Sequence, residues 1–118
     1  MKATIWHNPR CSKSRAALAI LEGTPGVEVE IVDYLKAAPT RPEIEAVLKK
    51  AGVRPSEALR KGEPVVKDIG LEITDDEAVL DAMAQHPILI ERAIVITEKG
   101  AVIARPPERV NELLAGTY

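Results

Sequence analysis

The stretch KATIWHNPRCSKSRAALAILEGTPGVEVEIV, residues 2–32, decides the fold of this chain. Residues 2–6 and 27–32 are typical of short strands, and the second alternates with a period of two residues, which predicts one buried face. Between them, apolar residues fall on one face of a helix that Gly23 would end. Two strands joined by a helix of about ten residues form a βαβ unit with parallel strands. We therefore predict an α/β protein.

The middle of the chain, about residues 40–86, is predicted to be a helical insertion. Both of its main helices open with a capping box, in which a hydroxyl stands three residues before a glutamate. The predicted elements are a helix from Thr40 to Gly52, a helical turn over 55–59, a loop over 60–64 and a helix from Thr74 to Pro87.

Two more strands and a last helix are predicted after the insertion. Residues 93–97 and 101–104 are apolar runs of strand length joined by a hairpin turn. Pro106-Pro107 would start a helix that ends at Gly116. The predicted order is β-α-β, three helices, β-β-α, a small mixed sheet interrupted by the insertion. At this length we expect a single domain over residues 1–118.

The composition excludes several classes of protein. The chain has 118 residues, of which 46% are hydrophobic and 29% charged, as in a globular domain. No stretch is long and apolar enough to predict a membrane span, and the N-terminus does not resemble a secretory signal. With 3% aromatic residues and a net charge of −2, nucleic-acid binding is not expected. The histidines and the cysteine lack the paired spacing of a metal site, so no metal is predicted.

Cys11 is the candidate nucleophile. It stands where the first predicted helix begins, and residues 1–21 contain no acid but several cations: Lys2, Arg10, Lys13 and Arg15. A helix N-terminus and nearby cations both favour an anion, so we expect a lowered thiol pKa and an oxyanion site in the same loop. The alternative is that Cys11 is a small buried residue without reactivity. The spacing fits neither a nucleotide-binding loop nor a cysteine phosphatase loop.

Cys11 is also the only cysteine in the chain. An intramolecular disulfide is therefore impossible, and a lone thiol is best preserved in a reducing compartment. We expect a cytoplasmic protein. Any redox cycle at Cys11 must take its second thiol from another molecule.

Four motifs resemble those of one family, the glutaredoxin-linked arsenate reductases, and they occur in the same order. They are His7-Asn-Pro-Arg-Cys11-Ser-Lys-Ser14-Arg, Arg60 after a helix, Leu89-Ile-Glu-Arg92, and Ala104-Arg-Pro-Pro-Glu108. The chain is shorter than the best-known members, which places it with a short branch of the family. The resemblance implies a thioredoxin-like fold with a helical insertion, in agreement with the predicted order.

The resemblance also implies a role for each matching residue. Cys11 would attack arsenate as the thiolate, and His7 and Ser14 would tune that thiolate. Three guanidinium groups would hold the oxyanion: Arg60, Arg92 and Arg105. Without the resemblance, each arginine would be read as a solvated surface residue. No bound cofactor is implied; glutathione would act as co-substrate, and glutaredoxin would reduce the resulting mixed disulfide.

Two other functions are compatible with the same motifs. The chain could be a thiol-dependent oxidoreductase that acts on a different oxyanion or on a disulfide. Alternatively, it could be a regulator that binds RNA polymerase, like the Spx regulators, which share this fold and similar motifs. Those regulators usually carry Cys-x-x-Cys, whereas this chain has Cys11-Ser-Lys-Ser14.

Ala93 departs from the family pattern, which has proline after the motif arginine. A cis peptide bond costs about 2.5–4 kcal/mol before a residue other than proline. From this cost we predict a trans bond between Arg92 and Ala93, a displaced backbone near Cys11, and weak glutathione-dependent turnover.

Overall fold

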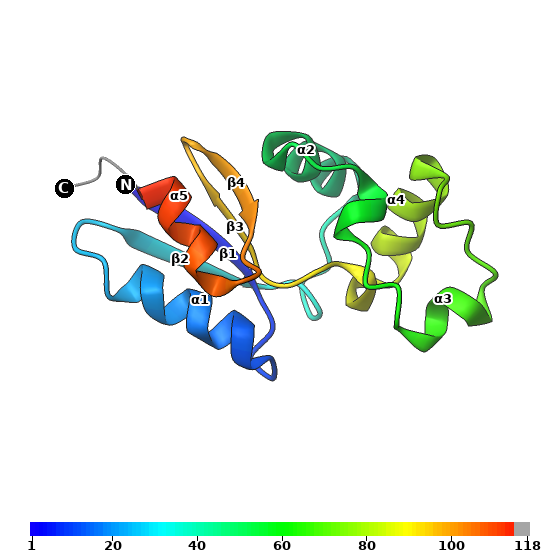
Figure 1. The fold of residues 1–118 in the computed structure, drawn as a ribbon, viewed down its shortest axis with the longest axis horizontal. Coiled ribbons are helices and arrows are strands. Elements are labelled where there is room, and N and C mark those ends of the chain that lie inside the picture. Colours follow the sequence, from blue (N-terminus) through cyan, green and yellow to red (C-terminus); the bar gives the residue numbers. More distant parts are fainter. Residues whose placement is uncertain (115–118) are drawn as a thin grey trace. The chain divides into compact units, whose positions relative to one another are not determined.

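The computed structural model describes residues 1–114, which form two compact units (Figure 1). Among the described residues, one unit contains 1–37 and 92–114, and the other is Ala38–Glu91. The second unit corresponds to the helical insertion predicted over about residues 40–86. The expectation of a single domain stays a prediction, and the expected helix end at Gly116 lies outside the described residues.

The first unit is built on a four-stranded mixed sheet with the order β2-β1-β3-β4. Strands β1 and β2 run parallel, whereas β3 is antiparallel to both β1 and β4. This arrangement confirms the predicted βαβ unit and the predicted hairpin. The strands are β1 (Lys2–His7), β2 (Glu28–Asp33), β3 (Ile94–Thr97) and β4 (Gly100–Ile103).

One face of this sheet is covered by α1 (Ser12–Glu22), the 3-10 turn η3 (Pro107–Val110) and α5 (Asn111–Leu114) (Figure 1). Because aromatic residues are scarce, the core between these layers consists of small and branched aliphatic side chains. Its buried members are Ala3, Ile5, Ala17, Leu21, Ala93, Val95, Val102, Ala104, Val110, Leu113 and Leu114. The sheet and α1 together fix the loop that carries Cys11.

Strand β2 differs from the prediction of one buried face. None of its residues is fully buried, and Ile31 is 50% exposed. The reason is its position at the edge of the sheet, where only β1 pairs with it. A period of two residues identifies a strand, but it does not tell an edge strand from a central one.

The second unit is helical, and its two longest helices are α2 (Arg41–Ala51) and α4 (Asp76–Gln85). The predicted capping box at Thr40 is confirmed: its hydroxyl accepts the Glu43 N–H at 3.3 Å, and the Glu43 carboxylate accepts the Thr40 N–H at 3.0 Å. Gly52 ends α2 with a φ of 71°, a left-handed conformation that favours glycine. The shorter elements of this unit are η1 (Pro55–Ala58), α3 (Pro64–Asp68) and η2 (Pro87–Leu89).

One local prediction for this unit is wrong, and one helix of the unit was not predicted. Helix α4 is capped by Asp75, whose carboxylate accepts the Ala78 N–H at 3.2 Å, whereas the Thr74 hydroxyl donates to Glu72 instead. The predicted loop over 60–64 leads directly into a helix that was not predicted, α3, which begins at Pro64, a residue that suits the first helical position. No side chain of α3 is fully buried, so an apolar stripe did not signal this helix.

Helices α2 and α4 pack against each other through buried aliphatic side chains, among them Ile44, Leu48, Val79, Leu80 and Met83. Within residues 1–114, no helix is both long enough and apolar enough to span a bilayer.

Candidate active site

Cys11 lies at the N-cap of α1, in the turn that connects β1 to that helix. Its backbone N–H donates to the Asn8 carbonyl at 3.0 Å, and its carbonyl accepts the Arg15 N–H at 3.0 Å. The turn therefore fixes the backbone on both sides of the thiol. The N–H groups of the first helical turn are left without helical partners, so they are available to an anion.

A hollow of about 290 Å³ opens beside Cys11. Its lining is strongly cationic and combines the N-terminal loop with two residues from the other end of the chain. The lining residues are Arg10, Cys11, Ser12, Lys13, Arg92 and Arg105. The structure thus brings two of the three predicted arginines, Arg92 and Arg105, to the predicted nucleophile.

The pKa of the Cys11 thiol is lowered from its ordinary value. Burial alone would raise this pKa, but three hydrogen bonds to the thiolate outweigh it: one from the Arg92 guanidinium and two from the backbone N–H groups of Ser14 and Lys13. The positive charge of Arg92 adds to their effect. Cys11 therefore has the electrostatic environment of a reactive thiolate, not that of a buried structural cysteine.

Arg92 also has hydrogen-bonding capacity that the described part of the protein leaves unused. Its Nε and Nη1 atoms are buried, and within residues 1–114 neither has a hydrogen-bond partner. Buried donors are normally satisfied, and unsatisfied ones are common at functional sites. An oxyanion in the hollow could accept from these atoms in the planar geometry that guanidinium groups favour.

His7, at the end of β1, and Ser14, in the first turn of α1, are buried, with 7% and 0% exposure. His7 Nδ1 is 2.7 Å from Ser14 Oγ, and the Asn8 N–H donates to the same oxygen at 3.0 Å. These two contacts hold the first turn of α1 against the end of β1. Ser14 also supplies one of the N–H groups that face the thiolate.

The pKa of His7 is lowered from its ordinary value of 6.5. Burial is the main cause, and Arg15 acts in the same direction. Asp33, the residue paired with His7 across β1 and β2, opposes the shift, as does Glu22. His7 is therefore neutral at pH 7, so it contributes hydrogen bonding and no charge near Cys11.

Arg60, the third predicted arginine, belongs to the helical unit. Its guanidinium pairs with Glu63 at 2.7 Å and with Glu91 at 3.8 Å, and it donates to the Ile88 carbonyl at 3.4 Å. Only 19% of the Arg60 side chain is exposed, so Arg60 is not the solvated surface residue expected without the family resemblance. Its role in holding an oxyanion stays a prediction.

The peptide bond between Arg92 and Ala93 is cis, so the prediction of a trans bond is wrong. That prediction considered only the intrinsic preference of an isolated bond. In the structure, Ala93 is fully buried and its carbonyl accepts the Ala104 N–H at 2.8 Å, so tertiary contacts fix the backbone here. The expectations of a displaced backbone and weak turnover rested on the trans bond and lose their basis.

Asn8 is a site residue that the sequence reasoning did not single out. It is 8% exposed, and its Oδ1 accepts the Arg10 N–H at 3.0 Å. Together with its contacts to Cys11 and Ser14, this bond shapes the turn that presents the thiol. The signal was present in the dipeptide Asn8-Pro9, which commonly starts a turn.

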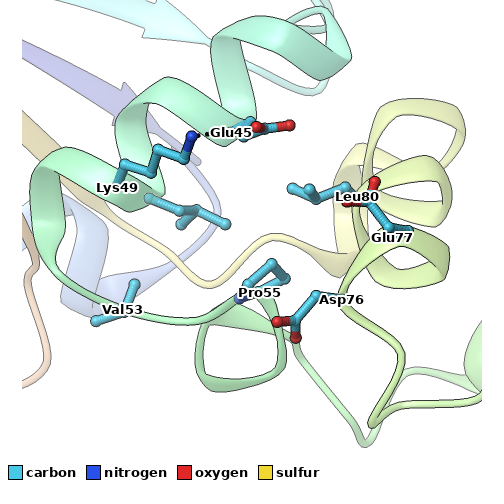
Figure 2. A pocket seen from close by; sticks show the side chains of 8 residues that line it. Glu45, Lys49, Val53, Pro55, Asp76, Glu77 and Leu80 are labelled. Atoms are coloured by element: carbon cyan, nitrogen blue, oxygen red, sulfur yellow. Dashed lines mark ion pairs between the residues drawn. The ribbon is translucent and has the colours of Figure 1, made fainter.

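A second hollow, of about 170 Å³, lies in the helical unit between α2 and α4 (Figure 2). Leu48 and Leu80 contribute apolar lining, and carboxylates surround them. Those carboxylates are already paired: Glu45 with Lys49 at 3.4 Å, and Asp76 with Arg54 at 3.3 Å. No cysteine or histidine lines this hollow.

Comparison with known proteins identifies the family that this chain resembles. Residues 6–113 match the model of the ArsC family. An arsenate reductase of Rhizobium meliloti (strain 1021) is 42% identical over 120 residues, covering 100% of this chain and 85% of that protein. An arsenate reductase of Escherichia coli (strain K12) is 40% identical over 114 residues, covering 94% of this chain and 79% of that protein.

A solved structure, described as an arsenate reductase from Vibrio cholerae, superposes with a TM-score of 0.89. It is 38% identical in sequence, and the match covers 97% of this chain and 98% of that one. The predicted fold class, a thioredoxin-like mixed sheet with a helical insertion, is thereby confirmed.

Proposed function

This chain belongs to the ArsC family, and on that premise we propose that it reduces arsenate to arsenite with Cys11 as the nucleophile and glutathione as the reductant. Membership confirms the predicted family and the predicted enzyme class, an oxidoreductase. The substrate, the co-substrate and the roles of individual residues are the content of the proposal.

One observation supports it most directly: the Cys11 thiol shares a cationic hollow with Arg92 and Arg105. A thiolate needs an electrophile within reach, and an anionic electrophile needs cations to offset its repulsion from the thiolate. Arg92 can act on both anions, because it stabilises the thiolate and retains two buried donors, Nε and Nη1, for an oxyanion.

In the proposed first step, Cys11 Sγ forms a bond to arsenic, and one arsenate oxygen takes up two protons and leaves as water. In the second step, a glutathione thiolate attacks Sγ. A sulfur–sulfur bond forms, the sulfur–arsenic bond breaks, and its electron pair stays on arsenic. Arsenic is thereby reduced from the pentavalent to the trivalent state and leaves as arsenite, while Cys11 remains as a mixed disulfide with glutathione.

The mixed disulfide requires an external thiol for its reduction. The chain has Ser14 three residues after Cys11 and contains no second cysteine, so an internal disulfide cannot form. We assign this step to glutaredoxin, which returns Cys11 to the thiolate and takes up the glutathione. Because glutathione and glutaredoxin supply the electrons, the proposed reaction needs no bound cofactor, and it suits the reducing cytoplasm.

The test is arsenite formation from arsenate by the purified protein with glutathione, with and without glutaredoxin. We expect multiple turnovers only when both are present. Cys11→Ser should abolish arsenite formation while its circular dichroism and thermal unfolding stay those of the wild type, because the serine oxygen is a far weaker nucleophile at neutral pH. Arsenite formation by Cys11→Ser would refute the assignment of the nucleophile. A wild-type protein that reduces no arsenate with any thiol would refute the proposed substrate.

A further inference from the structure

The cations of the Cys11 hollow fall into two groups. Arg92 is the inner one: its Nε and Nη1 are buried, and it hydrogen-bonds the thiolate. Arg10 and Lys13 line the same hollow, but both side chains are exposed to solvent. They stand one residue before and two residues after Cys11, one in the turn and the other in the first turn of α1.

Folding makes no use of the charges on Arg10 and Lys13. Within residues 1–114, neither side chain forms a hydrogen bond or an ion pair; the polar contacts of the two residues come from their backbones, the Arg10 N–H with Asn8 Oδ1 and the Lys13 N–H with the Cys11 thiolate. Neighbouring cations behave differently: Arg15 donates to the Pro9 carbonyl at 2.8 Å, and Lys2 pairs with Glu30 at 3.4 Å. The nearest positions along the chain offer no counter-charge, since residues 1–21 contain no acid. Two unpaired cations beside a thiolate are therefore free for a ligand.

The proposed reaction supplies a ligand of matching charge. Arsenate must be held at Sγ, where Arg92 has its free donors, but glutathione reaches Sγ from the solvent side. Glutathione is a tripeptide whose central cysteine is flanked by two residues that each carry a free carboxylate. A reactive sulfur between two carboxylates matches Cys11 between two cations.

We infer that Arg10 and Lys13 bind the two carboxylates of glutathione and make Cys11 selective for this thiol over neutral or cationic ones. This inference rests on the proposed function for its physiological setting. The two side chains should also make Cys11 prefer any small sulfur compound that carries carboxylates, whether or not arsenate is the substrate.

A disulfide-exchange experiment isolates this preference from arsenate chemistry. The Cys11 thiolate attacks oxidised glutathione, forming a mixed disulfide at Cys11 and releasing one glutathione thiolate. The rate is followed by mass spectrometry and compared with that for bis(2-hydroxyethyl) disulfide, which has no charge. Exposed ion pairs are weak, so we expect the preference for glutathione to fall about threefold in Arg10→Gln, about threefold in Lys13→Gln, and about tenfold in the double variant.

Three controls sharpen the result. Lys36→Gln removes an exposed lysine of the same unit outside the hollow and should leave the preference unchanged. Oxidised glutathione esterified at all its carboxylates keeps only its two ammonium charges, so it should lose the preference of the wild type and react no faster with the wild type than with the variants. Raising the ionic strength should lower the preference of the wild type but not that of the double variant, because salt screens exposed charges.

Charge reversal gives the strongest test. Arg10→Glu combined with Lys13→Glu should favour cystamine, a dicationic disulfide, over oxidised glutathione. An unchanged preference in the double glutamine variant would overturn the inference. So would an equal fall in the rates of both disulfides, since that would mean that the two cations act only on the Cys11 thiolate. None of these outcomes depends on arsenite formation, so failure of the inference is distinguishable from failure of the proposed function.

Discussion

Replacing Arg92 by glutamine should lower the ratio of thiolate to thiol at Cys11 more than any other substitution in the lining of the hollow. Arg92 acts on the sulfur through a hydrogen bond and through its positive charge. Glutamine keeps a polar side chain of moderate length but removes the charge and the guanidinium fork. The backbone N–H groups of Lys13 and Ser14 still stabilise the thiolate, so its share at a given pH should fall but not vanish.

The size of the effect follows from the kind of contact that is removed. A hydrogen bond to a charged group contributes about 1.5–3 kcal/mol. Cys11 is partly exposed, which calls for the lower end of that range. A loss of about 1.5 kcal/mol corresponds to a fall of about tenfold in the ratio of thiolate to thiol at a fixed pH.

The assay is the thiolate absorbance near 240 nm as a function of pH, together with the alkylation rate by iodoacetamide, which reports the same ratio. Arg105→Gln is the matched control. Arg105 lines the same hollow, yet it is not among the groups that lower the pKa of Cys11. A ratio within twofold of the wild type in a folded Arg92→Gln protein would refute this account of the thiolate, as would an equal fall in Arg105→Gln.

Three further predictions concern other residues of the site. Ser14→Ala leaves His7 Nδ1 and the Asn8 N–H without their buried partner, so urea unfolding should show a loss of about 1–3 kcal/mol; a smaller loss than 0.5 kcal/mol would contradict the proposed role of this contact. Because burial lowers the pKa of His7 in the folded state, the unfolded chain takes up the proton first as pH falls. The contribution of His7 should therefore be fully present above about pH 6.5 and decline below it, so the urea midpoint should fall less steeply between pH 7 and 5 in His7→Asn than in the wild type. Arg105→Lys keeps the charge but loses the planar fork, so the KM for arsenate should rise with the thermal midpoint unchanged, and equal losses of both would indicate a structural arginine.

Most of the fold could be predicted because its signals are local. The period of two residues over 27–32, the glycine after α1 and the hydroxyl three residues before Glu43 each report on a few neighbouring positions. Helix α3 could not be predicted, because five residues with no fully buried side chain give no periodic pattern of apolar residues. The position of β2 at the sheet edge depends on which strands pair, and this information is distributed over the whole chain.

The site divides in the same way. A lone cysteine among cations at a helix start predicted the lowered pKa of the Cys11 thiol, and the family resemblance added the arginines. The pairing of Arg60 with Glu91 could not be predicted, since the two residues are distant in sequence. The bond before Ala93 was misjudged for a related reason: an intrinsic preference was weighed without the contacts that surround a fully buried residue.

The placement of the aromatic residues gives the two compact units separate optical signals. The only tryptophan in the chain, Trp6, is buried in β1, and residues 38–91, which form the helical unit, contain no tryptophan, tyrosine or phenylalanine. Fluorescence therefore reports on the sheet that carries Cys11, whereas most of the far-ultraviolet dichroism of residues 38–91 comes from helices that fluorescence does not detect. Following both signals through one denaturant titration would separate unfolding of the sheet from unfolding of the insertion: coincident transitions mean one cooperative domain, and divergent transitions mean two.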